Sequence, residues 1–196
     1  MIRLFLPLLL LPSLALAQPP QTSVTPGRGR PDASATRRAE LDRLFEALKG
    51  APDAAGSQMV EARIRAVWAQ AVSPAAALLL RRGLRNLQGN EPAEALEDFD
   101  AALVLEPGAA DLWLLRARTL ARLGDRVAAA QDLREALRLE PRHFGALLQL
   151  AELQEEAGDA AGALRSLDAA LALYPHMPGG AERRRDLVRK AEGDAL

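Results

Sequence analysis

The sequence contains no cysteine. Disulfide bonds, zinc sites built on thiolates and cysteine nucleophiles are therefore excluded, and so is the lipid-modified N-terminal cysteine of a lipoprotein. Histidine is almost as scarce, because only His143 and His176 occur. No HExxH sequence, nucleophile-elbow sequence or glycine-rich phosphate loop after a strand is present. We therefore expect no catalytic residues, no cofactor, no metal site and no enzymatic activity.

Aromatic residues and net charge are also low. Aromatic side chains make up 4% of the chain, whereas hydrophobic residues make up 49%. Most of the hydrophobic residues are alanine and leucine, which favour helices over strands. The formal net charge is −1, which gives no overall attraction to nucleic acid or to an anionic membrane. We expect almost no sheet and no nucleic-acid partner.

The N-terminus has the pattern of an export signal. One positive charge, Arg3, precedes an apolar run over residues 4–16, and Ala15-Leu16-Ala17 supplies a small-x-small ending. The alternative, a membrane anchor, needs about 20 apolar residues, but this run is shorter and interrupted by prolines. We predict that residues 1–17 are a signal peptide cleaved before Gln18, so that the mature protein is periplasmic or secreted and has no membrane span.

A linker and a pair of helices follow the signal peptide. Residues 18–36 are rich in proline, glycine and small polar residues, which predicts a disordered linker. Apolar residues at three- and four-residue spacing then predict one helix over residues 37–49 and a second over residues 54–71. Together they form an N-terminal helix pair, residues 37–73.

A spacing of 34 residues recurs through the rest of the chain. The residues related by this step are Pro107, Pro141 and Pro175; Ala95, Ala129 and Ala163; Ala102, Ala136 and Ala170; and Phe99, Leu133 and Leu167. A period of this length predicts units of two helices that must stack to bury their apolar faces. The register places three units at residues 76–109, 110–143 and 144–177, within residues 74–175. Residues 178–196 then form a charged capping helix that closes the stack.

Both histidines lie at turns that end a unit, about one period apart. One interpretation is a metal site or an acid–base pair. The repeat register alone explains their spacing, however, so we predict that both are surface turn residues.

The unit resembles the tetratricopeptide repeat. The middle unit carries Trp113, Ala117, Ala129, Leu133 and Pro141 at the positions that define this family. The matching residues in the other two units are Gly83, Ala95, Phe99 and Pro107, and Ala151, Gly158, Ala163 and Pro175. The residues that stand where a tyrosine is usual are Asn86, Leu120 and Gln154.

The resemblance implies an all-α fold, a right-handed α-solenoid of stacked helix hairpins. Together with the predicted signal peptide, it indicates an exported bacterial-type member with three repeats, in which the N-terminal helix pair is a degenerate repeat. Its expected function is that of a non-enzymatic scaffold or adaptor of the cell envelope, which binds a partner peptide or protein on its concave surface.

Family members bind partners on a concave wall formed by the first helix of each pair. On this sequence the resemblance assigns that wall to Leu80, Leu84, Leu87, Asp111, Leu114, Arg118, Arg122, Leu148, Glu152, Glu155 and Glu156. Leu80 and Leu84 stand where members that clamp a C-terminal carboxylate carry basic and amide residues. The 34-residue step predicts cross-repeat ion pairs Arg118–Glu152 and Arg122–Glu156. It also leaves Glu155 unpaired, which favours a partner with basic groups.

The leucine stripe on the first repeat allows two interpretations. Leu80, Leu84 and Leu87 are either the partner site or the seat of the N-terminal helix pair, because a bare apolar patch is a liability. A structural, self-associating homodimer is the alternative function. The sequence identifies neither the partner nor the pathway.

Overall fold

The computed structural model describes residues 33–70 and 72–193, and these residues form nine α-helices and no strand. The helices are α1 (Ala33–Lys49), α2 (Ala54–Ala69), α3 (Pro74–Gln88), α4 (Pro92–Leu105), α5 (Ala110–Arg122), α6 (Arg126–Leu139), α7 (Phe144–Glu156), α8 (Ala160–Leu173) and α9 (Gly180–Gly193). The predicted signal peptide and most of the predicted linker lie outside the described residues. The expected all-α repeat fold is confirmed.

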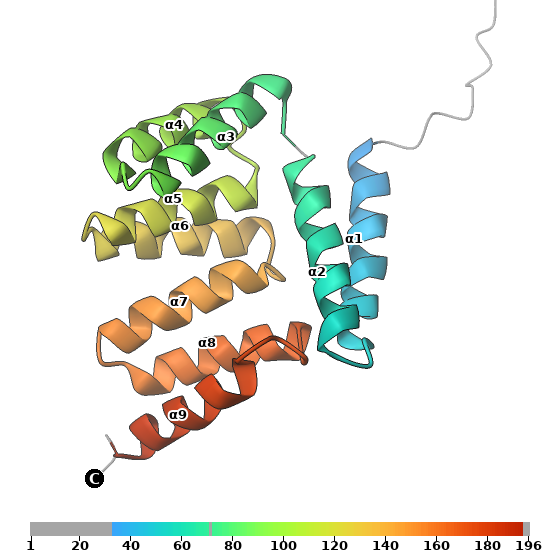
Figure 1. Cartoon of the computed structure of the whole chain (residues 1–196), viewed down its shortest axis with the longest axis vertical. Helices are drawn as coiled ribbons and strands as arrows, with labels where there is room; N and C mark the ends of the chain where they lie inside the picture. Colours follow the sequence, from blue (N-terminus) through green and yellow to red (C-terminus); the bar gives the residue numbers. More distant parts are fainter. Residues whose placement is uncertain (1–32, 71, 194–196) are drawn as a thin grey trace, which may run out of the picture.

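The pairs α3–α4, α5–α6 and α7–α8 stack as three layers, and α9 lies against the last of them (Figure 1). Helices α1 and α2 form a hairpin beside the stack and run across the direction of the repeat helices (Figure 1). The hairpin therefore does not add a further layer before α3. The interpretation of residues 37–73 as a degenerate repeat stays a prediction about the origin of this segment.

Each repeat turns between its helices through a residue of positive φ. Asn90, Gly124 and Gly158 have φ of 61°, 89° and 80°. The next residue donates its backbone N–H back into the first helix, as in the bond from Asp125 N to Leu120 O of 2.9 Å. This closes a left-handed helix end of the kind that glycine or asparagine supplies. In the second and third repeats an aspartate then caps the following helix, as Asp125 does for Ala128 N.

The two helices of a repeat approach closely because a small residue faces a large one. Ala117 and Ala151 on the first helices, and Leu133 and Leu167 on the second, have no exposed surface. The first repeat uses glycine at the small position and phenylalanine at the large one. A Cβ atom built on Gly83 would lie 2.7 Å from Phe99 Cε1. Because Gly83 has no Cβ atom, the first repeat has room for the phenylalanine ring.

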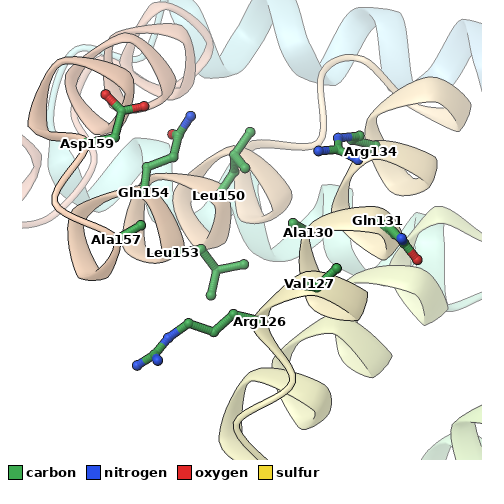
Figure 2. A pocket seen from close by; sticks show the side chains of 10 residues that line it. All are labelled: Arg126, Val127, Ala130, Gln131, Arg134, Leu150, Leu153, Gln154, Ala157 and Asp159. Carbon is green, nitrogen blue, oxygen red and sulfur yellow. The ribbon is translucent and has the colours of Figure 1, made fainter.

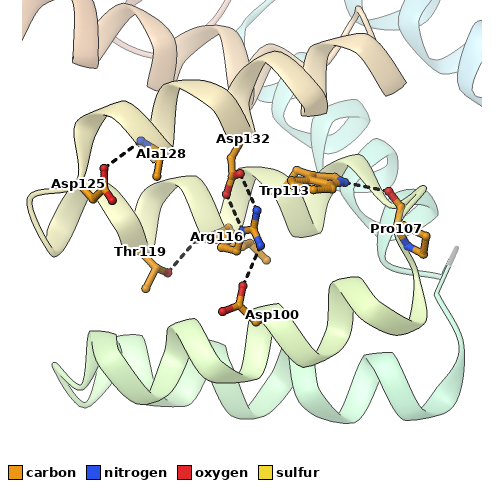
Figure 3. A network of polar contacts seen from close by, with 9 residues as sticks. Asp100, Pro107, Trp113, Arg116, Thr119, Asp125, Ala128 and Asp132 are labelled. Carbon is orange, nitrogen blue, oxygen red and sulfur yellow. Dashed lines mark hydrogen bonds and ion pairs between the residues drawn. The ribbon is translucent and has the colours of Figure 1, made fainter.

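Arginine–aspartate pairs connect the repeats along one edge (Figure 3). Arg116 on α5 donates two hydrogen bonds of 2.7 Å to Asp132 in its own repeat. Its Nη1 also donates to Asp100 of the preceding repeat at 2.8 Å. Two periods later, Arg184 on α9 donates to Asp168 of α8 at 2.7 Å. We call this row of pairs the arginine–aspartate ladder.

The C-terminal helix α9 packs against the last repeat of the stack. Leu187 is buried against Ala151, Ala163 and Leu167 of the last repeat. The opposite side of α9 is charged and exposed. A terminal helix with one apolar side and one polar side covers the open end of a stack and keeps it compatible with water.

We expect Gly83→Ala to destabilise the fold, although alanine is the better helix former. Overpacking a tight core costs about 1–3 kcal/mol, whereas the gain in helix propensity is about 1 kcal/mol. Urea denaturation should give a net loss of about 1 kcal/mol in the free energy of unfolding. The double variant Gly83→Ala, Phe99→Leu copies the other two repeats and should recover most of that loss. If the single variant is as stable as the wild type, the small-to-large packing does not limit the approach of α3 and α4.

Candidate functional site

The α1–α2 hairpin docks through aromatic side chains on the third repeat. Phe45 and Trp68 of the hairpin meet Phe144 at the start of α7 and Tyr174 at the end of α8. The ring centroids of Phe45 and Phe144 are 6.4 Å apart, and those of Phe144 and Tyr174 are 5.8 Å apart, both edge-to-face. Such pairs each add about 0.5–1.5 kcal/mol beyond the area that they bury. We call these four residues the aromatic cluster.

His143 is part of this contact. Its ring stacks on Trp68 with centroids 4.2 Å apart, and only 1% of the residue is exposed. Neither ring nitrogen makes a hydrogen bond, although Nε2 lies 3.5 Å from Asp111 Oδ1 on α5. The prediction of a surface turn residue is therefore wrong for His143, because the hairpin covers this turn. His176 is exposed and lies in a turn.

Polar contacts surround the aromatic cluster. The Arg142 guanidinium lies 4.5 Å from the centre of the Phe45 ring and binds Asp42 of α1 at 2.6 Å. On the other side, the Tyr174 hydroxyl lies 3.5 Å from Glu61 Oε2 on α2. Burial raises the pKa of Tyr174 above its ordinary value, so the hydroxyl stays protonated. The hairpin is thus fixed to both turns that flank the third repeat.

The predicted leucine stripe serves mainly as core. Leu80 is buried in a cluster with Phe99 and Leu112, and Leu87 packs against the same cluster. Leu84 is 36% exposed. The hairpin does not sit on these leucines, because its apolar side faces the third repeat. Leu114 is likewise buried, among core residues of the second and third repeats.

The glutamates of α7 all have basic partners, but not the predicted ones. Glu152 pairs with Arg183 at 3.4 Å, and Glu155 pairs with Arg183 and Lys190, which lie on α9. The hydrogen bond from Lys190 lowers the pKa of Glu155. Glu156 pairs with Arg126 at the start of α6 at 2.9 Å. The predictions of Arg118–Glu152 and Arg122–Glu156 pairs and of an unpaired Glu155 are therefore wrong, because residues of α9 and α6 reach these carboxylates.

The two arginines of the wall are left without a carboxylate among the described residues. Arg118 Nε donates to Gln149 Oε1 at 3.1 Å, and Arg122 Nη1 donates to the backbone oxygen of Leu87 at 3.2 Å. Burial lowers the pKa of Arg118, and the nearby Arg65 of the hairpin lowers it further. The carboxylates of Glu152 and Asp111 act in the opposite direction, but neither forms an ion pair with Arg118. Arg118 and Arg122 thus have no direct carboxylate contact among the described residues.

A cavity of about 480 Å³ lies between the hairpin and the third repeat. Its apolar floor includes Phe144, Leu148 and Tyr174, and its rim includes Arg65 and Arg183. Cavities of roughly 300–1,000 Å³ with an apolar lining and a few charged groups are typical of binding sites. Of the predicted wall residues, the structure brings Leu148 into this cavity and places Arg118 close to Arg65 at its edge.

The aromatic cluster was not predicted as a unit, although the repeat contains a signal for it. Phe144 stands where the earlier repeats have Ala76 and Ala110. Tyr174 stands where they have glutamate, at residues 106 and 140. Large aromatic residues that replace small or acidic ones at equivalent positions indicate a contact made by one repeat alone.

Within the described residues, no group of three or more histidine, aspartate or glutamate side chains is placed to hold a metal ion. No helix in that part of the chain is long and apolar enough to cross a membrane.

The sequence pattern of the tetratricopeptide repeat matches residues 80–139 and again residues 114–178. No curated protein matches the chain in sequence.

Solved structures share the fold. The first repeat domain of Spaghetti (RPAP3), bound to the HSP90 peptide SRMEEVD, is 18% identical with a TM-score of 0.58, covering 62% of this chain and 97% of that one. The TPR2B domain of yeast Sti1, in a complex with pHsp70, is 24% identical with a TM-score of 0.56, covering 62% and 99%. The Sgt2 repeat domain from Aspergillus fumigatus is 20% identical with a TM-score of 0.57, covering 64% and 86%.

We expect Trp68→Ala to release the hairpin while the repeats stay folded. Removing a large aromatic side chain from a packed contact costs about 3–5 kcal/mol, and Trp68 contacts both His143 and Phe144 of the stack. Hydrogen exchange should become faster over residues 34–69 and stay unchanged over residues 92–139. Met59→Ala is the matched control, because Met59 lies on the same helix and is 72% exposed. Unchanged exchange in the Trp68 variant would show that the aromatic cluster does not hold the hairpin.

Proposed function

We propose that this chain, which belongs to the tetratricopeptide repeat family, is a non-enzymatic scaffold of the cell envelope that binds an acidic segment of a partner protein on its concave wall. Domains of this family are protein–protein interaction modules that bind peptides. Our proposal adds three points to this family role: the envelope location, the concave wall as the binding site, and an acidic partner.

The charge left over on the wall supports the acidic partner. Every glutamate of α7 pairs with a basic residue of this chain. Arg118 and Arg122, in contrast, form no ion pair with a carboxylate in the described part of the chain. A partly buried charge without a direct ion pair costs free energy, which a carboxylate of a partner relieves. This is the observation that carries the proposal, and it reverses the expectation of a basic partner.

The hairpin supplies the second half of the proposed site. Its Arg65, which pairs with Glu61 at 2.6 Å, lies near Arg118, and the cavity that the hairpin forms with Phe144 and Leu148 suits an apolar side chain. A segment with an acidic residue and an apolar residue a few positions apart would contact both parts. We therefore assign the hairpin to the binding site, as one wall of a narrowed groove.

Self-association through the leucine stripe has less support. Leu80 and Leu87 pack within the first two repeats, so Leu84 and part of Leu87 are what the stripe offers to a second copy. The contact observations therefore favour a partner protein over a homodimer.

The envelope location rests on the sequence of residues 1–17, which lie outside the described residues. We expect the protein purified from its native source to begin Gln-Pro-Pro, because cleavage after Ala17 follows the small-x-small pattern. N-terminal sequencing of the mature protein measures this directly. A folded protein that retains Met1 in the cytosolic fraction would contradict export.

Replacing both wall arginines should weaken partner binding. Peptides selected by display on the purified chain should be rich in aspartate and glutamate. Arg118→Gln with Arg122→Gln should lower the affinity of the best peptide by about tenfold or more, because a charge-assisted hydrogen bond contributes about 1.5–3 kcal/mol. Fluorescence anisotropy at two salt concentrations gives the dissociation constants.

Arg85→Gln is the control for this experiment, because Arg85 is exposed at the end of α3 and outside the wall. Selection of basic peptides, or equal affinity for wild type and the double variant, would rule out the arginines as the recognition residues.

A further inference from the structure

The arginine–aspartate ladder is interrupted at one place. The arginine position of the ladder is occupied by Arg82, Arg116, Leu150 and Arg184 in steps of 34 residues. The aspartate position on the preceding second helix is occupied by Asp100, Arg134 and Asp168. In the flanking grooves an arginine therefore meets an aspartate, as in Arg116 with Asp100 and Arg184 with Asp168. Between α6 and α7 the pair is replaced by Leu150 and Arg134.

The change at this groove is compensated inside the third repeat. The third ladder position, Asp98 and Asp132 in the first two repeats, is occupied by Ser166 in the third. Ser166 Oγ lies 2.6 Å from the side-chain amide of Gln154, so the loss of the arginine leaves no buried acid without a partner. The polar groups at the ladder position inside the third repeat thus have hydrogen-bond partners. Among the ladder residues of this groove, Arg134 on the outer side is the one without a partner in the described part of the chain.

A groove opens where the pair is missing. It has a volume of about 390 Å³ and lies between α6 and α7 (Figure 2). Leu150 and Leu153 lie on the α7 side and Val127 and Ala130 on the α6 side, with Arg134 at one end. Val127 is 72% exposed, although it is a large apolar residue. Arg134 makes no ion pair or hydrogen bond within the described residues.

The groove is separate from the concave wall. At about 100° per residue, Leu150 and Leu153 project from the side of α7 opposite to Leu148 and Glu152. A ligand in this groove therefore has no access to Arg118 or to the hairpin.

We infer that the α6–α7 groove is a second docking site, which takes an amphipathic helix of a partner protein that carries an acidic residue one turn from an aliphatic residue. The carboxylate binds Arg134, and the aliphatic side chain covers Val127 and Leu150. The ladder itself supplies the reason for this chemistry. At the flanking positions an arginine–carboxylate pair forms at 2.7–2.8 Å between neighbouring helices. Between α6 and α7 the arginine stands at the aspartate position and faces Leu150, so a carboxylate from a partner would complete a pair of the same kind.

A helix fits this site better than an extended chain. The groove runs between two helices, and side chains one turn apart lie on the same side of a helix. Arg126 also lines the groove but pairs with Glu156. Arg134 is therefore the one lining arginine without a carboxylate in the described part of the chain, and it matches one carboxylate, whereas a phosphate group needs several donors.

The test uses two helical peptides of alanine-based sequence that differ at one residue. The first has an aspartate four residues before a leucine, and the second has asparagine in place of the aspartate. Titration of the full-length protein, followed by amide NMR, should give a dissociation constant about tenfold lower for the aspartate peptide. The perturbed amides should be those of residues 127, 130, 134, 150 and 153.

Two variants complete the test. Arg134→Gln should remove the preference for the aspartate peptide. Arg165→Gln should keep it, because Arg165 is an exposed arginine on α8 with no ion pair in the described part of the chain. The triple variant Arg134→Asp, Leu150→Arg, Ser166→Asp restores the ladder of the other grooves. It should fold with an unchanged or higher melting temperature and should lose peptide binding.

Equal affinity for both peptides, an unchanged preference in Arg134→Gln, perturbed amides on the concave wall, or no binding to either peptide would each overturn the inference. A sedimentation mass of a dimer that Arg134→Asp reduces to that of a monomer would assign the groove to a second copy of this chain. That result would also overturn the partner proposed here. Because Arg134 and Val127 make no contact with the wall arginines Arg118 and Arg122, neither result depends on the function proposed above.

Discussion

The close approach of two helices within each repeat is the contact on which the rest of the structure depends. An alanine or glycine on the first helix faces a leucine or phenylalanine on the second, and neither is exposed. This spacing fixes the angle of each hairpin, and hence the register at which the next one stacks. The ladder, the wall and the grooves follow from that register, because it brings residues 34 positions apart in the sequence into equivalent places.

Residues that differ from their equivalents in the other repeats make the contacts that are specific to this chain. Phe144 and Tyr174 replace an alanine and a glutamate, and they hold the hairpin. Leu150 and Arg134 replace an arginine and an aspartate, and a groove opens beside them. Both sets lie at or next to the third repeat. The first two repeats therefore act mainly as support, and most of the specific contacts are concentrated at the C-terminal end of the stack.

Much of the fold could be predicted from the sequence, because its signals are local. The Gly-Asp turns and the apolar side of each helix depend on residues within one or two helical turns of each other, and the 34-residue period repeats these local signals. The position of the hairpin does not, because Trp68 and His143 are far apart in the chain and no period relates them. The same limit explains the wall charges. The 34-residue spacing predicts that Arg118 and Glu152 lie on neighbouring helices, and they do. It does not predict the basic side chains of α9 and α6, and these are the ones that pair with the glutamates of α7.

The hairpin changes how the stack unfolds. In an open solenoid each repeat contacts only its neighbours, so the ends fray and units melt in sequence. Here Ser57 Oγ lies 3.5 Å from the backbone oxygen of His176, 119 residues later. This contact joins the start of the array to its end and closes the intervening chain into a loop. Opening either end then requires breaking the closure as well, which couples the repeats into one cooperative unit. Closing a loop of this length costs conformational entropy, so the hairpin raises the contact order of an otherwise local fold.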